Sequence, residues 1–179
     1  DTQGVLKILK QKIKNIDEFN PLCLTIACNT AHLMLDELKT STNTPFFSII
    51  EEVTKNVSNA KLRKVGLLAS PVTIESGMYQ MELQGKNIET VLPSRKDVLI
   101  VEGVIRNVLA GKIRGTDRIE LISVALRQRS KGAEGIILGC TELPLVFPKS
   151  FPIPVFDSIE ILARALLQKF YESKRGNQT

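Results

Sequence analysis

The sequence is short of cysteine, histidine and long apolar runs. Its 179 residues include three cysteines and one histidine, and three cysteines are too few for a disulfide-stapled secreted domain. No apolar run approaches the roughly 18 residues that a membrane span needs. The opening residues Asp1–Gly4 lack the basic segment followed by an apolar one that marks a signal peptide. We therefore expect a soluble protein of the reducing cytoplasm, with no membrane partner.

Phosphate-binding loops are also missing from the sequence. Neither a Gly-x-Gly-x-x-Gly nor a Walker-type pattern occurs, which argues against a dinucleotide or nucleoside-triphosphate enzyme. The net charge of +5 comes from scattered basic residues without interleaved aromatics, so we expect no nucleic-acid partner. Cys28, His32 and Cys140 could meet around zinc, but a fourth ligand and Cys-x-x-Cys spacing are lacking. We expect no metal and no other cofactor.

Short apolar runs alternate with segments of helical spacing along the chain. The length allows one ordinary domain or two small ones, and a composition of 43% hydrophobic and 24% charged residues is typical of globular proteins. The alternation indicates an α/β fold with mainly parallel sheets flanked by helices. The strands are predicted at residues 22–27, 46–50, 65–69, 88–92, 135–138 and 153–156, and the helices at 4–15, 31–38, up to 57, 74–83, 96–109, 117–129 and 157–171.

Two cysteines occupy equivalent places in this pattern. Leu24–Thr30 and Ile136–Glu142 both place a cysteine, Cys28 or Cys140, directly after an apolar strand. Ligands of open parallel sheets bind beyond the carboxyl ends of the strands, and a helix that starts there lowers the pKa of a thiol. Two such thiols on opposite faces of an α-carbon can remove and return a proton without a cofactor, with coupled titrations. The repeat therefore suggests two facing halves around an acid and a base.

Other interpretations of these cysteines stay open. Buried free cysteines often serve as small hydrophobic residues, and Cys23, inside an apolar run, is interpreted in this way. A disulfide between Cys28 and Cys140 is disfavoured by a reducing compartment.

The two cysteine segments resemble the signature motifs of one protein family. Ala27–His32 and Gly139–Leu143 look like the two motifs of aspartate racemases, in the aspartate/glutamate racemase superfamily, and the similarity extends from about Asp1 to Tyr171. The resemblance implies two pseudosymmetric α/β lobes that enclose the substrate, with one cysteine from each lobe. It also implies an isomerase that uses neither pyridoxal phosphate nor a metal, and we expect a homodimer.

The resemblance gives boundaries for the two lobes. The first lobe covers residues 1–60, the second lobe covers residues 61–154, and the final helix within 155–179 returns to the first lobe. The family's opening strand, glycine-rich loop and substrate-binding arginine have no counterpart here. Because a sheet without its opening strand leaves backbone groups unpaired, we expect the native polypeptide to extend upstream of Asp1.

The resemblance also assigns a substrate class and site residues. Glutamate racemases usually have histidine after the second Cys-Thr, whereas Glu142 stands here, which favours aspartate or another acidic amino acid. Lys112 would bind the distal carboxylate, or is a solvated loop lysine. Glu142 would orient or repolarise Cys140, or caps its helix. The remaining residues are Asn29, Thr30, Thr73 and Thr141 for the α-carboxylate and amino group, and Ser70 and His32 in supporting positions.

One departure affects this site, and several rival functions stay open. Val72 precedes Thr73 where the family usually has glycine, so the backbone would approach a carboxylate less closely. Within the superfamily, the rivals are glutamate racemase, hydantoin racemase and maleate isomerase. A catalytically silent amino-acid-binding or interaction domain is the alternative from a different class.

Overall fold

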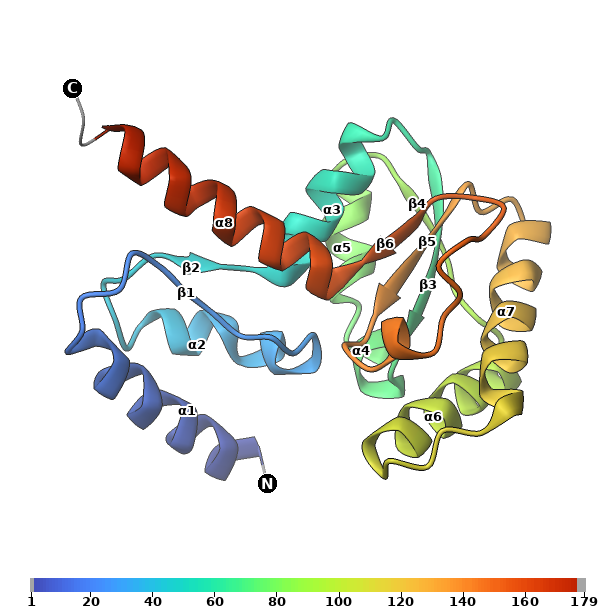
Figure 1. Cartoon of the computed structure of the whole chain (residues 1–179), viewed down its shortest axis with the longest axis horizontal. Coiled ribbons are helices and arrows are strands. Elements are labelled where there is room, and N and C mark those ends of the chain that lie inside the picture. The colour runs from blue at the N-terminus through green and yellow to red at the C-terminus, as the bar shows by residue number, and fades with distance from the viewer. Residues whose placement is uncertain (1, 177–179) are drawn as a thin grey trace.

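A computed structural model describes residues 2–176, so Asp1 and residues 177–179 of the predicted lobes lie outside the described part. It contains two parallel sheets and the helices that flank them (Figure 1), which confirms the predicted α/β fold class. The strands are β1 (Leu24–Thr25), β2 (Phe46–Phe47), β3 (Lys64–Ala69), β4 (Glu89–Val91), β5 (Gly135–Gly139) and β6 (Val155–Asp157). The helices are α1 (Thr2–Asp17), η1 (Thr30–Met34), α2 (Leu35–Lys39), α3 (Ile49–Asn59), α4 (Pro71–Glu75), α5 (Met78–Gln84), α6 (Arg95–Leu109), α7 (Gly115–Ser130), η2 (Leu143–Leu145) and α8 (Ser158–Gly176).

The larger sheet has the strand order β4-β3-β5-β6, with every neighbouring pair parallel. Its two central strands, β3 and β5, consist of apolar residues and glycine almost throughout because both faces of the sheet are covered. Helices α3, α5 and α8 pack on one face around Val53, Leu67 and Ile137. Helices α6 and α7 cover the other face around Leu121 and Ile136. We call this four-stranded unit the main body.

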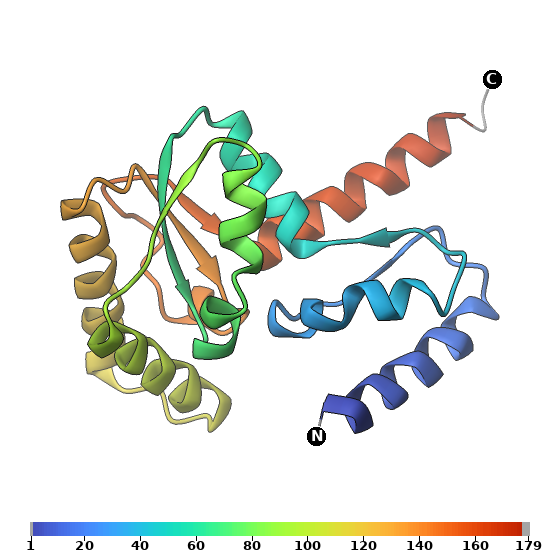
Figure 2. The ribbon, with the colours of Figure 1, turned by 180° about the vertical axis from the view of Figure 1, so that it is seen from behind.

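The smaller sheet pairs β1 with β2 over two residues only. Its apolar cluster gathers Leu6 and Ile13 from α1 with Leu38 from α2. Figures 1 and 2 show this unit, which we call the first segment (residues 2–47), beside the main body, with η1 next to α4. The chain passes from the first segment into the main body at α3, which packs on the larger sheet.

Several predicted elements differ from those observed. The strand predicted at 22–27 is reduced to β1, because it has a single short neighbour to bond. The helix predicted at 31–38 is a 3₁₀ turn, η1, followed by the short α2. The helix predicted at 74–83 is divided between α4 and α5, since Gly77 adopts a left-handed φ of 72° that glycine tolerates. At the other end, α8 continues to Gly176, beyond its predicted end at residue 171.

Candidate functional site

The register of β3 and β5 brings two of the predicted site residues together. In this register Ala69 lies opposite Gly139. The next residue is Ser70 on one strand and Cys140 on the other. Because parallel strands end at the same edge of a sheet, this serine and this cysteine leave the main body side by side. They lie at the edge where ligands of open parallel sheets bind.

Three hydroxyl groups join the first segment to this edge. The Thr30 hydroxyl lies 3.2 Å from that of Ser70 and 2.9 Å from that of Thr73. Ser70 donates to the Thr73 hydroxyl at 3.0 Å and, as the N-cap of α4, accepts from the Thr73 backbone N–H at 3.3 Å. We call these three side chains the hydroxyl cluster. Thr73 is fully buried, whereas Thr30 and Ser70 are half-buried and form the side of the cluster nearer the solvent.

Asn29 forms a second connection between the two units. Its side-chain oxygen accepts a 2.6 Å hydrogen bond from the Tyr79 hydroxyl, and its amide donates to the Ser158 hydroxyl at 3.2 Å. Asn29 is 3% exposed and Tyr79 is fully buried. A Cβ at Gly139 would lie 3.1 Å from the Tyr79 ring, so glycine leaves room for the ring there. Asn29 is therefore fixed from two elements of the main body, directly beside Cys28.

Cys28 itself is exposed, in the loop between β1 and η1. The His32 ring Nδ1 lies 2.9 Å from the Cys28 carbonyl oxygen, and its Nε2 lies 3.0 Å from the Ile49 backbone nitrogen. A backbone N–H only donates, so Nε2 accepts, the ring is neutral and its proton is on Nδ1. Burial lowers the pKa of His32, and the charge of Lys39 acts in the same direction. His32 thus links the Cys28 loop to the start of α3.

Metal ligation by this histidine is not compatible with its contacts, because both ring nitrogens are engaged. Within residues 2–176, no group of three or more histidine, cysteine, aspartate or glutamate side chains could hold a metal ion.

Cys140 lies in a different environment from Cys28. It is half-buried, and its thiol donates a 3.0 Å hydrogen bond to Glu142 Oε2. The Thr141 hydroxyl donates to the same oxygen at 2.9 Å. Burial raises the pKa of Cys140 to about 12, and the Glu142 carboxylate and the negative charge of Cys28 add to the rise. The expectation that a helix start lowers the pKa of each thiol is therefore wrong for Cys140, because only the one-turn η2 follows it and a carboxylate faces it.

The structure does not bring every predicted residue into contact. Lys112 is exposed in the turn between α6 and α7. Figure 1 shows this turn at the end of the main body to which the strand arrows point. Within the described residues, no hydrogen bond or ion pair connects it to the other predicted site residues. Sequence reasoning missed the roles of Tyr79 and Ser158. Ser158 was expected at the start of a helix, and Tyr79 lies in the stretch Ser70–Tyr79 that resembles a loop and helix of the family, but neither contact with Asn29 follows from spacing.

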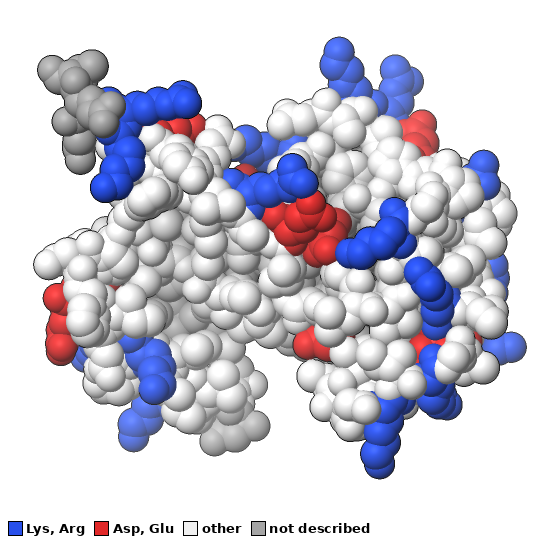
Figure 3. Space-filling model, viewed as in Figure 1, with Lys and Arg blue, Asp and Glu red and all other residues white. Residues whose placement is uncertain are grey.

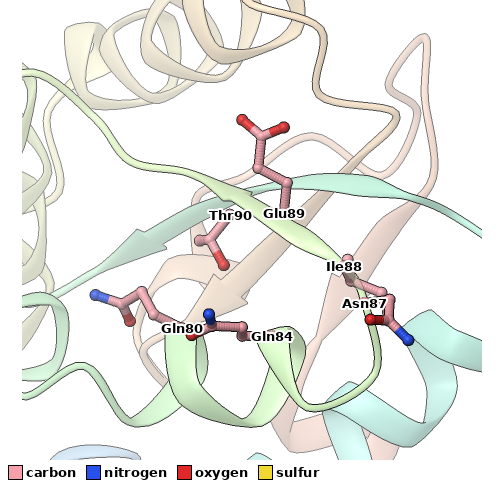
Figure 4. A pocket seen from close by; sticks show the side chains of 6 residues that line it. All are labelled: Gln80, Gln84, Asn87, Ile88, Glu89 and Thr90. Carbon is pink, nitrogen blue, oxygen red and sulfur yellow. The ribbon is translucent and has the colours of Figure 1, made fainter.

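The surface is hollowed between the two units and also along edge strand β4. In Figure 3 the molecule is hollowed at its lower edge between the first segment and the main body, and the basic side chains stand in separate groups. A hollow of about 520 Å³ lies elsewhere, along edge strand β4, where Gln80, Gln84 and Thr90 line it (Figure 4). It contains neither cysteine. In the described part of the chain, no helix is long and apolar enough to span a bilayer.

Comparisons with known proteins agree with this geometry. A crystal structure of an aspartate racemase homologue from Pyrococcus horikoshii OT3 is 32% identical, with a TM-score of 0.81 over 93% of this chain and 74% of that chain. The Picrophilus torridus aspartate racemase is 27% identical, with a TM-score of 0.76 over 91% of this chain and 68% of that chain.

The sequence comparisons point to the same group of proteins. A glutamate racemase from Aquifex pyrophilus is 30% identical over 149 residues, which are 80% of this chain and only 56% of that enzyme. The chain thus spans little more than half the length of that relative. A sequence model of the Asp/Glu/Hydantoin racemase family matches residues 1–166. With a match over most of its length, this chain belongs to the Asp/Glu/Hydantoin racemase family.

Proposed function

We propose that the protein is a cofactor-independent amino-acid racemase that inverts the α-carbon of aspartate or a similar acidic amino acid, with Cys28 and Cys140 as its base and acid. The observation that carries the proposal is the contact between the two units next to the two thiols. The Thr30 hydroxyl, two residues after Cys28, lies 3.2 Å from that of Ser70. Ser70 follows Ala69, and Cys140 follows Gly139, the partner of Ala69 in the strand register. The two cysteines thus come from different units whose neighbouring side chains are in contact. A substrate α-carbon between them would present one face to each sulfur.

The reaction balances without an added cofactor. The thiolate takes the α-proton, so the Cα–H bond breaks and its electron pair stays on the carbon as a carbanion. The second thiol donates its proton to the opposite face and becomes the thiolate. The negative charge therefore moves from one sulfur to the other, and the centre is inverted.

The neighbouring side chains suit an amino-acid substrate. Hydroxyl groups can donate hydrogen bonds to a carboxylate, and Thr30 and Ser70 present theirs on the half-buried side of the hydroxyl cluster. Thr73 is fully buried, so we assign it the role of holding those two in place. Asn29 uses one of its two amide hydrogens for Ser158, and the other is assigned to the substrate together with Thr141.

The proposal that the substrate is an acidic amino acid rests on fewer observations. Lys112 is exposed in the turn between α6 and α7 and is assigned to the distal carboxylate. Two of the structural relatives are described as an aspartate racemase and an aspartate racemase homologue, whereas a sequence relative is a glutamate racemase. The presence of Glu142 after the second Cys-Thr favours aspartate.

The test is chiral separation of aspartate after incubation with the purified protein in heavy water. We expect inversion with solvent deuterium at the α-position, because the proton delivered comes from a different thiol than the one that accepts it. Cys28→Ser and Cys140→Ser should each reduce inversion by at least about a thousandfold, since a hydroxyl is a far weaker acid. Cys23→Ser, which changes a thiol outside the site, is the matched control and should stay active.

Two outcomes would contradict the mechanism. Full activity in either site variant, or inversion without deuterium uptake, excludes a reaction between two thiols. Inversion of glutamate but not aspartate keeps the mechanism and corrects the substrate.

A further inference from the structure

The Glu142 side chain is placed either to cap a helix or to interact with Cys140. It precedes η2 at the N-cap position, but its side chain makes no capping hydrogen bond there. Its Oε2 instead accepts from the Cys140 thiol at 3.0 Å and from the Thr141 hydroxyl at 2.9 Å. The backbone of this turn is closed by hydrogen bonds from Leu143 N–H to Cys140 O at 3.2 Å and from Leu145 N–H to Glu142 O at 3.2 Å. The carboxylate is thus held against the sulfur by a short turn.

The chemistry of the pair decides where its proton lies. A 3.0 Å contact between sulfur and carboxylate oxygen needs one proton, because two anions at that distance repel each other. An ordinary carboxyl group has a pKa near 4.3 and an ordinary thiol one near 8.5, so the proton belongs to the sulfur. The Thr141 hydroxyl stabilises the carboxylate as an anion. Cys140 is therefore a thiol at neutral pH.

Among the described residues, no cation near Cys140 stabilises its thiolate form. Among residues 2–176, the charged groups that act on Cys140 are Glu142 and Cys28, and both are acidic. Tyr79, which faces Cys140 from α5, is buried with its hydroxyl donated to Asn29, and the charge of Cys140 helps to raise its pKa. By contrast, Cys28 is exposed and has no hydrogen-bonded carboxylate within the described residues.

We propose that Glu142 is a positioning residue that keeps the proton on Cys140, and so makes Cys28 the base and Cys140 the acid of the resting protein. This inference rests on the two-thiol racemase proposed above. It adds an asymmetry that two similar motifs do not predict. After one inversion Cys140 is a thiolate beside the Glu142 carboxylate and Cys28 is a thiol. The resting state returns when Cys28 releases its proton to solvent and Cys140 takes one up, or when a substrate of opposite configuration gives its α-proton to Cys140 and receives that of Cys28.

The experiment measures thiol reactivity rather than activity alone. Iodoacetamide is applied between pH 7 and 10.5, and alkylation of each cysteine is followed by peptide mass spectrometry, with Cys28 as the internal reference. In the unmodified protein, the Cys140 rate should still rise about tenfold per pH unit at the top of this range. In Glu142→Gln it should level off at lower pH, and at pH 9 it should exceed the unmodified rate at least about tenfold.

Two further variants separate charge from structure. Glu142→Asp keeps the carboxylate, so its profile should lie closer to that of the unmodified protein. Glu120→Gln removes a half-buried carboxylate on α7 that pairs with Arg114, and it should leave the reactivity of both cysteines unchanged. A Cys140 profile in Glu142→Gln that matches the unmodified protein would overturn the inference, because the carboxylate would then not hold the proton.

Kinetics distinguish this inference from the proposed function. The basic limb of the pH profile of kcat/KM reports loss of the acid's proton in the free enzyme. It should move to lower pH in Glu142→Gln and return towards its original position in Glu142→Asp. Suppose that the wild-type protein inverts the substrate, but Glu142→Gln shifts neither the basic limb of the kcat/KM profile nor the alkylation profile of Cys140. That result overturns the inference about Glu142 and leaves the proposed function standing. A shift in alkylation with no inversion of any acidic amino acid overturns the proposed function, and the assignment of base and acid with it.

Discussion

The two cysteines follow strands that differ in almost every physical respect. Cys140 follows β5, whose five residues are all buried and which has a hydrogen-bonded neighbour on each side. Cys28 follows β1, which has two residues and one neighbour. One thiol is consequently half-buried and bonded to a carboxylate, whereas the other is exposed in a loop. The same run of apolar residues, cysteine and polar residues thus produces two chemical environments, because the surrounding sheet decides burial.

The largest expected effect concerns the local stability of these two units. Native-state hydrogen exchange should show the amide of Leu24 in β1 at least about a hundredfold less protected than that of Leu67 in β3, a difference of roughly 2.8 kcal/mol. The reason is that β1 has few ladder bonds and a small apolar cluster, whereas Leu67 lies at the centre of the larger core. Equal protection at both amides would show that the first segment opens only with the whole protein.

The main body should also be the less tolerant unit when volume is added. A Cβ at Gly66 would lie 2.5 Å from Gln128 Oε1 and 2.8 Å from Ile136 Cδ1, so Gly66→Ala should lower the free energy of unfolding by about 2 kcal/mol. Urea denaturation measures this. Gly103→Ala is the control, because its Cβ would meet nothing within 4 Å in α6, and it should stabilise by about 0.5–1 kcal/mol. Similar changes in unfolding free energy for both variants would contradict tight packing around Gly66.

The connection between the two units can be weakened by removing one hydroxyl. Tyr79→Phe leaves the buried Asn29 oxygen without its 2.6 Å donor, which should cost about 1–2 kcal/mol of unfolding free energy. The chain's other tyrosine, Tyr171, is 60% exposed, so Tyr171→Phe should have almost no effect. Denaturation of both variants under one condition makes the comparison. Unchanged stability in Tyr79→Phe would mean that the connection does not contribute.

The smallest expected effect is the pH dependence that arises from His32. Its pKa is lowered in the folded protein, so below the ordinary value near 6.5 the unfolded chain binds more protons than the folded one. The stability from the neutral ring should be fully present above about pH 6.5 and should decrease as the pH falls towards the folded pKa. Urea denaturation at pH 8 and pH 5.5 measures the loss. His32→Gln should remove that part of the dependence, and an unaltered dependence would assign it to other groups.

The main body was largely predictable because its strands are buried on both faces. Such strands appear as unbroken apolar runs, and β3 and β5 were predicted to within one residue at each end. The first segment was less predictable, since the length of β1 depends on a neighbour 22 residues away in the sequence. Strand order and register likewise depend on packing between distant parts of the chain.

The candidate site also has features that could be predicted from the sequence and features that could not. The gathering of Thr30, Ser70 and Thr73 followed from the resemblance to a family, and the structure brings these three hydroxyls into contact. The direction of the Cys140 pKa could not be predicted, because it depends on burial and on the rotamer of Glu142. Tyr79 contacts Asn29 from 50 residues away, and periodicity carries no information on such a contact.

The pairing of Ala69 with Gly139 has a consequence for how this protein can diversify. Insertion of one residue into β5 would displace Cys140 by about 3.3 Å and turn the neighbouring side chains to the opposite face. The exposed turn around Lys112 carries no such constraint and can change in length or charge without disturbing the strands. In the function proposed above, substrate preference and proton transfer would therefore lie in parts of the chain that can evolve separately, one in an exposed turn and the other in a fixed alignment of strands.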